Sequence, residues 1–241
     1  MTSDGETTGA SRAQLTAEFV GTATLVTAVV GSGIMAQNLS VDEGLILLQN
    51  AFATAAALVA LILAFGPASG AHFNPVVTLA AVLFGTLSNR AALAYVAAQT
   101  AGAILGVIVA NAMFGLPIIE LSSENRGAAE LVFSETVATF GLVLVIFAVV
   151  RSGSTRAAAF AVAGYIAGAY YFTSSTSFAN PAVTVARTLS DTFTGIAPAS
   201  APAFIAAQIV GALAAVIVAR TIYPHDPIDN TLDDVSREVL K

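Results

Sequence analysis

Two stretches of the chain decide the fold: SGAHFNPVVTLA (Ser69–Ala80) and STSFANPAVTVA (Ser175–Ala186). Each places an Asn-Pro pair ahead of a short apolar run. Proline is tolerated at the first position of a helix and asparagine is a preferred N-cap, so each pair predicts a helix start. The runs that follow, roughly 74–84 and 180–190, are too short to cross a bilayer, because a spanning helix takes about 20 apolar residues.

The composition identifies lipid as the solvent for most of the chain. It is 56% hydrophobic and only 10% charged, whereas soluble domains carry about 25% charged residues. Six segments are long and apolar enough to span a bilayer: roughly 14–36, 44–66, 91–114, 130–150, 157–173 and 202–221. Lipid tolerates the two shorter runs only as re-entrant half-helices that are buried in protein or line a watery cavity.

Internal repetition sets the topology of these segments. YVAAQTAGAILGVIVA (Tyr95–Ala110) is matched by FIAAQIVGALAAVIVA (Phe204–Ala219), and AEFVGTATLV (Ala17–Val26) is matched by SETVATFGLV (Ser134–Val143). Together with the two Asn-Pro stretches, the matches are offset by 109, 117 and 106 residues. The nearly constant offset indicates that each half holds three spans and one half-helix.

An odd number of spans gives the two halves opposite topology, which is the inverted-repeat arrangement with a site at the midplane. We expect an all-α integral membrane protein, one channel domain over residues 1–241, with repeat one at about 14–114 and repeat two at about 130–221. Both tails are short. With the N-terminus inside, seven basic residues lie on the cytoplasmic side and Arg126 lies in an outer loop, as the positive-inside rule requires. This predicts a multi-pass protein of the inner (plasma) membrane with both termini cytoplasmic.

Other classes of function find little support in the residues. The chain has no cysteine and two histidines, so we expect no disulfide, no metal site and no cofactor. No Ser-His-Asp set or phosphate-binding loop is recognisable, so we do not expect an enzyme. The few basic residues are scattered without aromatic neighbours, which argues against a nucleic-acid partner.

The predicted topology brings the N-termini of the two half-helices together near the bilayer centre. Each N-terminus carries about half a positive charge and free backbone N–H groups. The amides of Asn74 and Asn180 can also offer N–H groups to a passing solute. Such a centre holds neutral hydrogen-bonding molecules and repels cations and protons. The alternative is that both asparagines simply cap short buried helices.

Duplicated Asn-Pro half-helices in a six-span inverted repeat resemble the aquaporin and aquaglyceroporin (major intrinsic protein) family, from about Gln14 to Thr221. The resemblance implies a passive channel for small neutral solutes in the lipid bilayer, assembled as a homotetramer with a pore in each protomer. It also implies the residues of the pore centre: Asn74, Pro75, Val76, Asn180, Pro181 and Ala182.

One departure from the family concerns the narrow outer filter. The family usually has arginine directly after the second Asn-Pro-Ala, where this sequence has Val183. Counting from the two asparagines gives Thr54, Gly168 and Ser177 as the other filter positions. This ring is small and lacks a fixed cation, so it predicts a wider opening than a water-selective pore has. The Val-for-Arg pattern also resembles bacterial aquaglyceroporins associated with arsenic resistance.

The predicted solutes are therefore glycerol-like polyols, the neutral hydroxide of trivalent arsenic, and water. Two alternatives remain open: a water-selective aquaporin and an ion-coupled transporter of small solutes. The first would need a narrower filter than the inferred ring. The second would need ionisable groups at the midplane, where Glu18 and Glu135 are the only carboxylates embedded in spans.

Four further polar residues are candidates for supporting the loops. Glu18 and Glu135 can relay protons or can accept hydrogen bonds from re-entrant backbone N–H groups, and we favour the second role. Gln99 is one of the residues on which the resemblance to the major intrinsic protein family rests. His72 lies just before the first half-helix, where it either gates the pore by titration or props the pore wall; we favour the prop.

Arg187 lies one helical turn beyond Val183 and faces nearly the same way. Its guanidinium can lie over the outer mouth as a displaced version of the missing filter charge. Alternatively it pairs with Asp191 at the i,i+4 spacing on the vestibule wall. The sequence favours the pair slightly.

Overall fold

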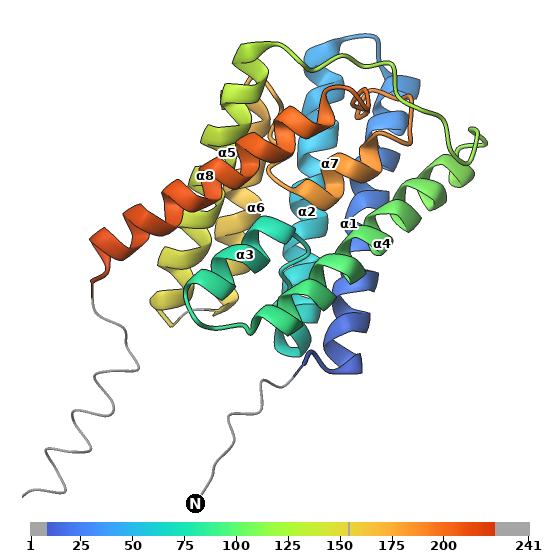
Figure 1. Cartoon of the computed structure of the whole chain (residues 1–241). Helices are drawn as coiled ribbons and strands as arrows, with labels where there is room; N and C mark the ends of the chain where they lie inside the picture. Colours follow the sequence, from blue (N-terminus) through green and yellow to red (C-terminus); the bar gives the residue numbers. More distant parts are fainter. Residues whose placement is uncertain (1–8, 154, 225–241) are drawn as a thin grey trace, which may run out of the picture.

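The computed structural model describes residues 9–153 and 155–224. Every element of regular secondary structure in these ranges is an α-helix. They are α1 (Arg12–Leu39), α2 (Glu43–Ser69), α3 (Pro75–Leu83), α4 (Asn89–Met113), α5 (Ala129–Arg151), α6 (Thr155–Phe172), α7 (Pro181–Arg187) and α8 (Ala201–Ile222). Figure 1 shows the long helices as a bundle around the short α3 and α7. Most of both predicted tails, residues 1–8 and 225–241, lies outside the described residues.

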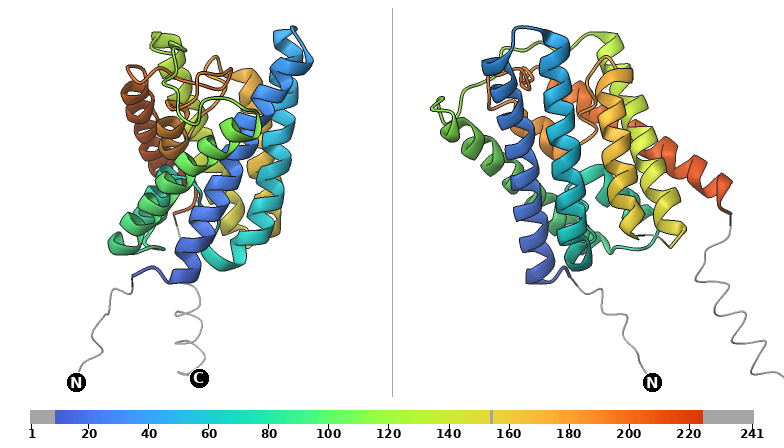
Figure 2. Two further views of the ribbon diagram at one scale, coloured as in Figure 1. Left: turned by 90° about the vertical axis from the view of Figure 1, so that its right-hand side faces the viewer. Right: turned by 180° about the vertical axis from the view of Figure 1, so that it is seen from behind.

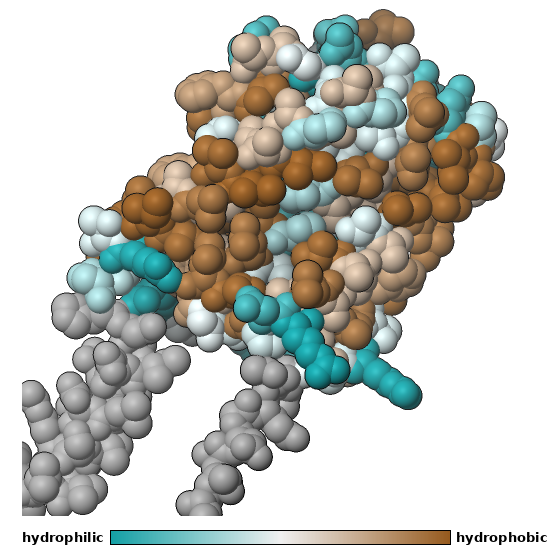
Figure 3. All heavy atoms as spheres, viewed as in Figure 1, coloured by the Kyte–Doolittle hydropathy of each residue, from teal (hydrophilic) through white to brown (hydrophobic). Residues whose placement is uncertain are grey.

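Within the described residues, five helices are long and apolar enough to cross a membrane: α1, α2, α4, α5 and α8. The sixth predicted span, 157–173, forms α6, which has 18 residues and packs against α2 and α5. Figure 3 shows hydrophobic side chains over the front of the bundle, with polar ones gathered toward its two ends. All-helical architecture with membrane-spanning helices is therefore confirmed.

The bundle has two end faces (Figures 1 and 2). The terminal face holds the start of α1, the turn between α5 and α6, and the end of α8. The loop face, at the opposite end, holds the connections 114–128 and 188–200. The half-helix α3 lies toward the terminal face and α7 toward the loop face.

Close helix pairs repeat in the two halves of the chain: α1 packs on α4, and α5 packs on α8. A Cβ atom at Gly102 would overlap the backbone carbonyl oxygen of Phe19, and one at Gly211 would overlap that of Thr136. Only glycine lets the two backbones approach so closely. These glycines therefore fix the α1–α4 and α5–α8 contacts that surround the half-helices.

The half-helices begin where the Asn-Pro pairs predict. Asn74 caps α3, since its Oδ1 accepts a hydrogen bond from the Val76 N–H at 3.0 Å, and Pro75 is the first helical residue. Asn180 caps α7 in the same way through Ala182 N–H at 3.0 Å. The second run was expected to reach residue 190, but α7 ends at Arg187. The chain turns there because the carbonyls of residues 188 and 189 accept hydrogen bonds from Ser122 and Glu120 of the other loop.

Candidate solute pore

The two caps are joined across the centre of the molecule. The Nδ2 of Asn74 donates to the carbonyl of Ala179 at 2.8 Å, and the Nδ2 of Asn180 donates to the carbonyl of Phe73, also at 2.8 Å. Each asparagine therefore caps its own half-helix with Oδ1 and holds the opposite re-entrant loop with Nδ2. The two positive helix ends are locked facing each other.

Left-handed backbone recurs in both re-entrant loops. Five non-glycine residues have φ between 46° and 62°, all of them just before an Asn-Pro pair: Ala71, Phe73, Thr176, Ser177 and Ala179. Such conformations cost on the order of 1–3 kcal/mol each and persist only where surrounding contacts impose them. Here they turn successive backbone N–H groups away from the pore and toward a buried carboxylate.

In the first loop that carboxylate is Glu18, which is fully buried on α1. Its Oε1 accepts from the Ser69 hydroxyl at 2.6 Å and the His72 N–H at 3.0 Å. Its Oε2 accepts from the Phe73 N–H at 2.7 Å and the Gln99 amide at 2.8 Å. Four hydrogen bonds to one carboxylate satisfy the loop backbone and keep the charge solvated by protein.

Glu135 on α5 serves the second loop in the same geometry. Its oxygens accept from the N–H groups of Phe178 at 2.9 Å and Ala179 at 2.8 Å, and from the amide of Gln208 at 2.7 Å. Gln208 is not among the site residues predicted from the sequence. The repeat that aligns it with Gln99 is the signal that could have identified it.

His72 lies between the first loop and the solute path. Its Nδ1 is 3.1 Å from the Thr78 hydroxyl, and its ring meets the Tyr95 ring edge-on at 5.4 Å between centroids. Thr78 also accepts from Gln99 at 2.9 Å and donates to the Asn74 carbonyl at 3.1 Å. The imidazole therefore belongs to the network that positions α3, and it also lines the cavity described next.

A cavity of about 1020 Å³ runs beside the half-helices. It is lined by Arg156 and Gly153 near the terminal face, by Asn74 and Asn180 at the centre, and by Arg187 toward the loop face. The opposite wall is apolar and repeats every four residues on two helices: Leu58 and Ile62 on α2, and Ala158, Val162 and Ile166 on α6. A polar stripe, formed by Arg156, Asn74, Asn180 and Arg187, thus faces the apolar wall along the length of the path.

Toward the loop face the cavity is lined by three of the four inferred filter residues, Thr54, Ser177 and Val183. The prediction of Gly168 as the fourth filter residue is wrong, because this residue is exposed and does not line the cavity. Its place is taken by Tyr170, whose hydroxyl lies 3.1 Å from the Thr54 hydroxyl. Residues at 158, 162, 166 and 170 share one helix face, whereas residue 168 is about 200° around the helix from 166.

Arg187 is buried, with an exposed fraction of 4%, and lines the cavity. Its Nε donates to the Thr194 carbonyl, and its guanidinium carbon lies 3.4 Å from the centroid of the Phe178 ring. The slightly favoured pair with Asp191 does not form, because that carboxylate accepts from the N–H and hydroxyl of Ser123 at 2.8 and 3.0 Å. The connection 188–200 folds back over Arg187 and draws it away from Asp191.

Arg126 adds a second cation at the loop face. Its guanidinium donates to the carbonyls of Gly195 at 2.8 Å and Phe193 at 3.1 Å, and lies 5.2 Å from the Phe178 centroid. Burial lowers its pKa from the ordinary value, while Glu124 and Glu135 oppose the shift. Two guanidinium groups therefore lie close to one aromatic ring, that of Phe178.

The fold and this path define a membrane channel built on paired re-entrant half-helices, and comparisons with known proteins agree. The family model described as "Major intrinsic protein" matches residues 6–157. "Aquaglyceroporin AqpS" of Rhizobium meliloti (strain 1021) is 48% identical over 213 residues, which is 88% of this chain and 91% of that protein. "Probable aquaporin TIP3-2" of Oryza sativa subsp. japonica is 36% identical over 168 residues, 67% and 63% of the two chains.

A solved structure supports the same fold. The X-ray structure of the aquaglyceroporin from Plasmodium falciparum superposes with a TM-score of 0.68 at 20% identity, covering 92% of this chain and 98% of that one. The chain belongs to the major intrinsic protein family. The resemblance seen in its motifs is thereby confirmed, and so is the expectation that the protein is a channel and not an enzyme.

Proposed function

We propose that this protein is a passive channel for small neutral solutes: water, glycerol-like polyols and the neutral hydroxide of trivalent arsenic. The observation that carries the proposal is the cavity that passes both Asn74 and Asn180 between an apolar wall and a polar stripe. Such a path suits molecules that have an apolar side and hydroxyl groups. The name of the relative AqpS, an aquaglyceroporin, supports the polyol class.

Selectivity against ions is proposed to come from fixed positive charge. The N-termini of α3 and α7 converge at the centre, and the guanidinium of Arg187 lies in the path toward the loop face. In this proposal Arg187 replaces the arginine that the family usually carries at the position of Val183. The filter is then formed by Thr54, Tyr170, Ser177, Val183 and Arg187.

A water-selective pore is the second candidate, because Tyr170 and Arg187 bring two large side chains to the filter region. An ion-coupled transporter has less support. Glu18 and Glu135 are fully buried in hydrogen bonds to the loops and do not line the cavity. We assign them, together with Gln99 and His72, to loop support.

We also propose an orientation and an oligomeric state for the channel. The terminal face is cytoplasmic, because basic residues gather at the helix ends on that side: Arg12, Arg90, Arg151, Arg156 and Arg220. The protein is a homotetramer in the inner (plasma) membrane, with one pore per protomer, as in the family it resembles. Chemical cross-linking followed by denaturing gel electrophoresis tests the tetramer.

Stopped-flow light scattering on proteoliposomes tests the solute class. Gradients of sucrose, glycerol and arsenite report the permeability to water, polyol and trivalent arsenic hydroxide in turn. We expect all three to exceed those of empty liposomes, with fluxes linear in the gradient. Water flux alone would establish the water-selective candidate, whereas saturable flux driven by a proton or sodium gradient would overturn passive conduction.

A further inference from the structure

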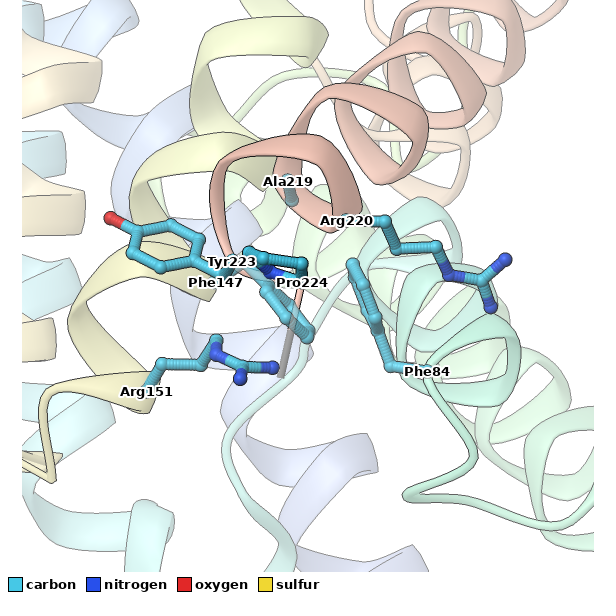
Figure 4. Close-up of a pocket in the computed structure, with 7 residues that line it drawn as sticks. All are labelled: Phe84, Phe147, Arg151, Ala219, Arg220, Tyr223 and Pro224. Atoms are coloured by element: carbon cyan, nitrogen blue, oxygen red, sulfur yellow. The ribbon is translucent and has the colours of Figure 1, made fainter. Parts of the chain in front are cut away.

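A second pocket opens at the terminal face, apart from the central residues of the solute path. It has a volume of about 340 Å³ and lies among the ends of three helices, lined by Phe84 after α3, Phe147 and Arg151 on α5, and Ala219, Arg220, Tyr223 and Pro224 at the end of α8. Figure 4 shows the two arginines on either side of the aromatic rings. The pocket thus combines an apolar floor with a cationic rim.

The cations of the rim are held in place by their neighbours. Arg220 donates to the Leu83 carbonyl, and its guanidinium carbon lies 5.8 Å from the centroid of Phe84. The guanidinium carbon of Arg151 lies 5.7 Å from the centroid of Tyr223. Guanidinium groups are suited to bidentate contacts with phosphate oxygens, and these two lie within cation–π distance of aromatic rings.

The surface that leads to the pocket is apolar and faces outward. Val210, Leu213 and Ile217 on α8 have exposed fractions of 56%, 41% and 67%, and they precede Arg220 at helical spacings of three and four residues. These four residues share one side of α8, which is among the helices long and apolar enough to span the membrane. An exposed apolar stripe on such a helix is in contact with acyl chains.

We propose that this pocket binds the phosphate of an anionic phospholipid. The headgroup phosphate contacts Arg220, on the side of the pocket to which the stripe of Val210, Leu213 and Ile217 leads, and an acyl chain follows that stripe. Arg151, on the other side of the aromatic rings, adds to the positive potential of the site (Figure 4). Basic pockets between transmembrane helices at the cytoplasmic side bind anionic headgroups in this manner. A lipid fits this site better than a free anion, because the apolar stripe continues directly into the cationic rim and a free anion would not require that stripe.

The site bears on transport through its position. Phe84, Phe147 and Arg151 line both this pocket and the terminal end of the solute cavity. A lipid bound here would hold the ends of α3 and α5 together beside the mouth of the path. Anionic lipid is therefore expected to stabilise the protein without taking part in solute selection.

Native mass spectrometry of the detergent-solubilised full chain tests the proposal with phosphatidylglycerol and phosphatidylcholine as probes. We expect retained phosphatidylglycerol in the wild type and a loss of about 30-fold in affinity for the double variant R151Q/R220Q, because each basic group near a headgroup contributes roughly five-fold. The matched control is R90Q, which removes an exposed arginine at the same face outside the pocket. Equal retention in R151Q/R220Q and R90Q would overturn the proposal.

Three further arms keep the result interpretable. The melting temperature of the wild type should rise with phosphatidylglycerol more than with phosphatidylcholine, a reading that needs no variant. Inorganic phosphate that displaces the lipid completely at millimolar concentration would show a free-anion site instead. A chain ending at Pro224 should retain the lipid as the full chain does; a large gain in retention would show that the acidic segment 225–241 is the occupant and would overturn the lipid assignment.

Discussion

Asn74 and Asn180 bind each other's loops: each amide nitrogen donates at 2.8 Å to the carbonyl of the residue before the other asparagine, Ala179 for Asn74 and Phe73 for Asn180. Their side-chain oxygens cap their own half-helices at the same time. One pair of residues therefore joins the two halves of the chain and fixes the midpoint of the solute path. Variants around this pair test separate parts of the account.

Replacing Gly102 with alanine should destabilise the protein. The new Cβ would overlap the Phe19 carbonyl oxygen, which is backbone and cannot move without separating α1 from α4. Such overpacking costs about 1–3 kcal/mol. The free energy of unfolding, measured by denaturant titration in detergent, should fall by that amount.

Gly164 supplies the matched control for this substitution, because nothing lies within 4 Å of a Cβ built there. Gly164→Ala on α6 should leave stability unchanged or raise it by up to about 1 kcal/mol, since alanine is the better helix former. Equal destabilisation by the two variants would mean that close helix approach at Gly102 is not the cause.

Glu18→Gln should destabilise the first re-entrant loop. A glutamine presents an NH₂ group to donors that now point at a carboxylate oxygen, so at least one buried N–H loses its acceptor. The expected cost is about 1.5–3 kcal/mol in the free energy of unfolding. The exposed Glu43→Gln, on the first turn of α2, is the control.

The same variant separates loop support from proton relay. If Glu18 only supports the loop, the glycerol flux of the folded fraction of Glu18→Gln keeps its wild-type insensitivity to a proton gradient. Wild-type flux that depends on the gradient, and loses this dependence in Glu18→Gln, would argue for the relay.

How far the sequence predicts this molecule differs from one residue to the next. The Asn-Pro pairs predict both half-helix starts because a cap and a first-turn proline act within a few residues. Glu18 could be matched to its loop through the repeat. The prediction of Gly168 is wrong because counting back from Asn180 assumes a connection of fixed length between α6 and the motif. The rotation of α6 about its axis determines which residue faces the path. The slight preference for an Arg187–Asp191 pair is wrong because the partners of Arg187 lie in the connection 188–200, whose course depends on contacts with the loop 114–128.

Tyr170 and Gly168 provide a direct test of that rotation. Tyr170→Ala should raise glycerol flux relative to water flux, because it removes a large side chain beside Thr54. Gly168→Ala should change neither, since an added Cβ would meet only Phe172 at 3.7 Å. A filter response at Gly168 with none at Tyr170 would reverse the assignment.

Arg187→Ala should weaken the barrier to cations. Two unit charges about 8 Å apart interact by about 2 kcal/mol at an effective dielectric constant of about 20, so removing this charge should raise proton or sodium leak about 30-fold. Arg187→Lys keeps the charge and should keep most of the barrier. Leak measured with pH-sensitive dye in proteoliposomes distinguishes the two, and an unchanged leak in Arg187→Ala would exclude Arg187 from the filter.

Val183→Arg places a guanidinium one turn closer to Asn180. Because it narrows the filter, it should reduce glycerol flux more than water flux. Equal loss of both solutes in the stopped-flow assay would mean that the narrowest point lies elsewhere along the cavity.

The most direct measurement of the central claim, that solutes cross through this cavity, uses a thiol placed at Val183. The chain contains no cysteine, so Val183→Cys carries the only thiol, and Gly168→Cys puts the matched thiol on the outer side of α6. Glycerol permeability of proteoliposomes is measured before and after complete labelling with a small methanethiosulfonate, verified by mass spectrometry. The account predicts that labelling lowers the permeability of Val183→Cys to that of empty liposomes and leaves Gly168→Cys and the wild type unchanged; full glycerol flux through labelled Val183→Cys would contradict it.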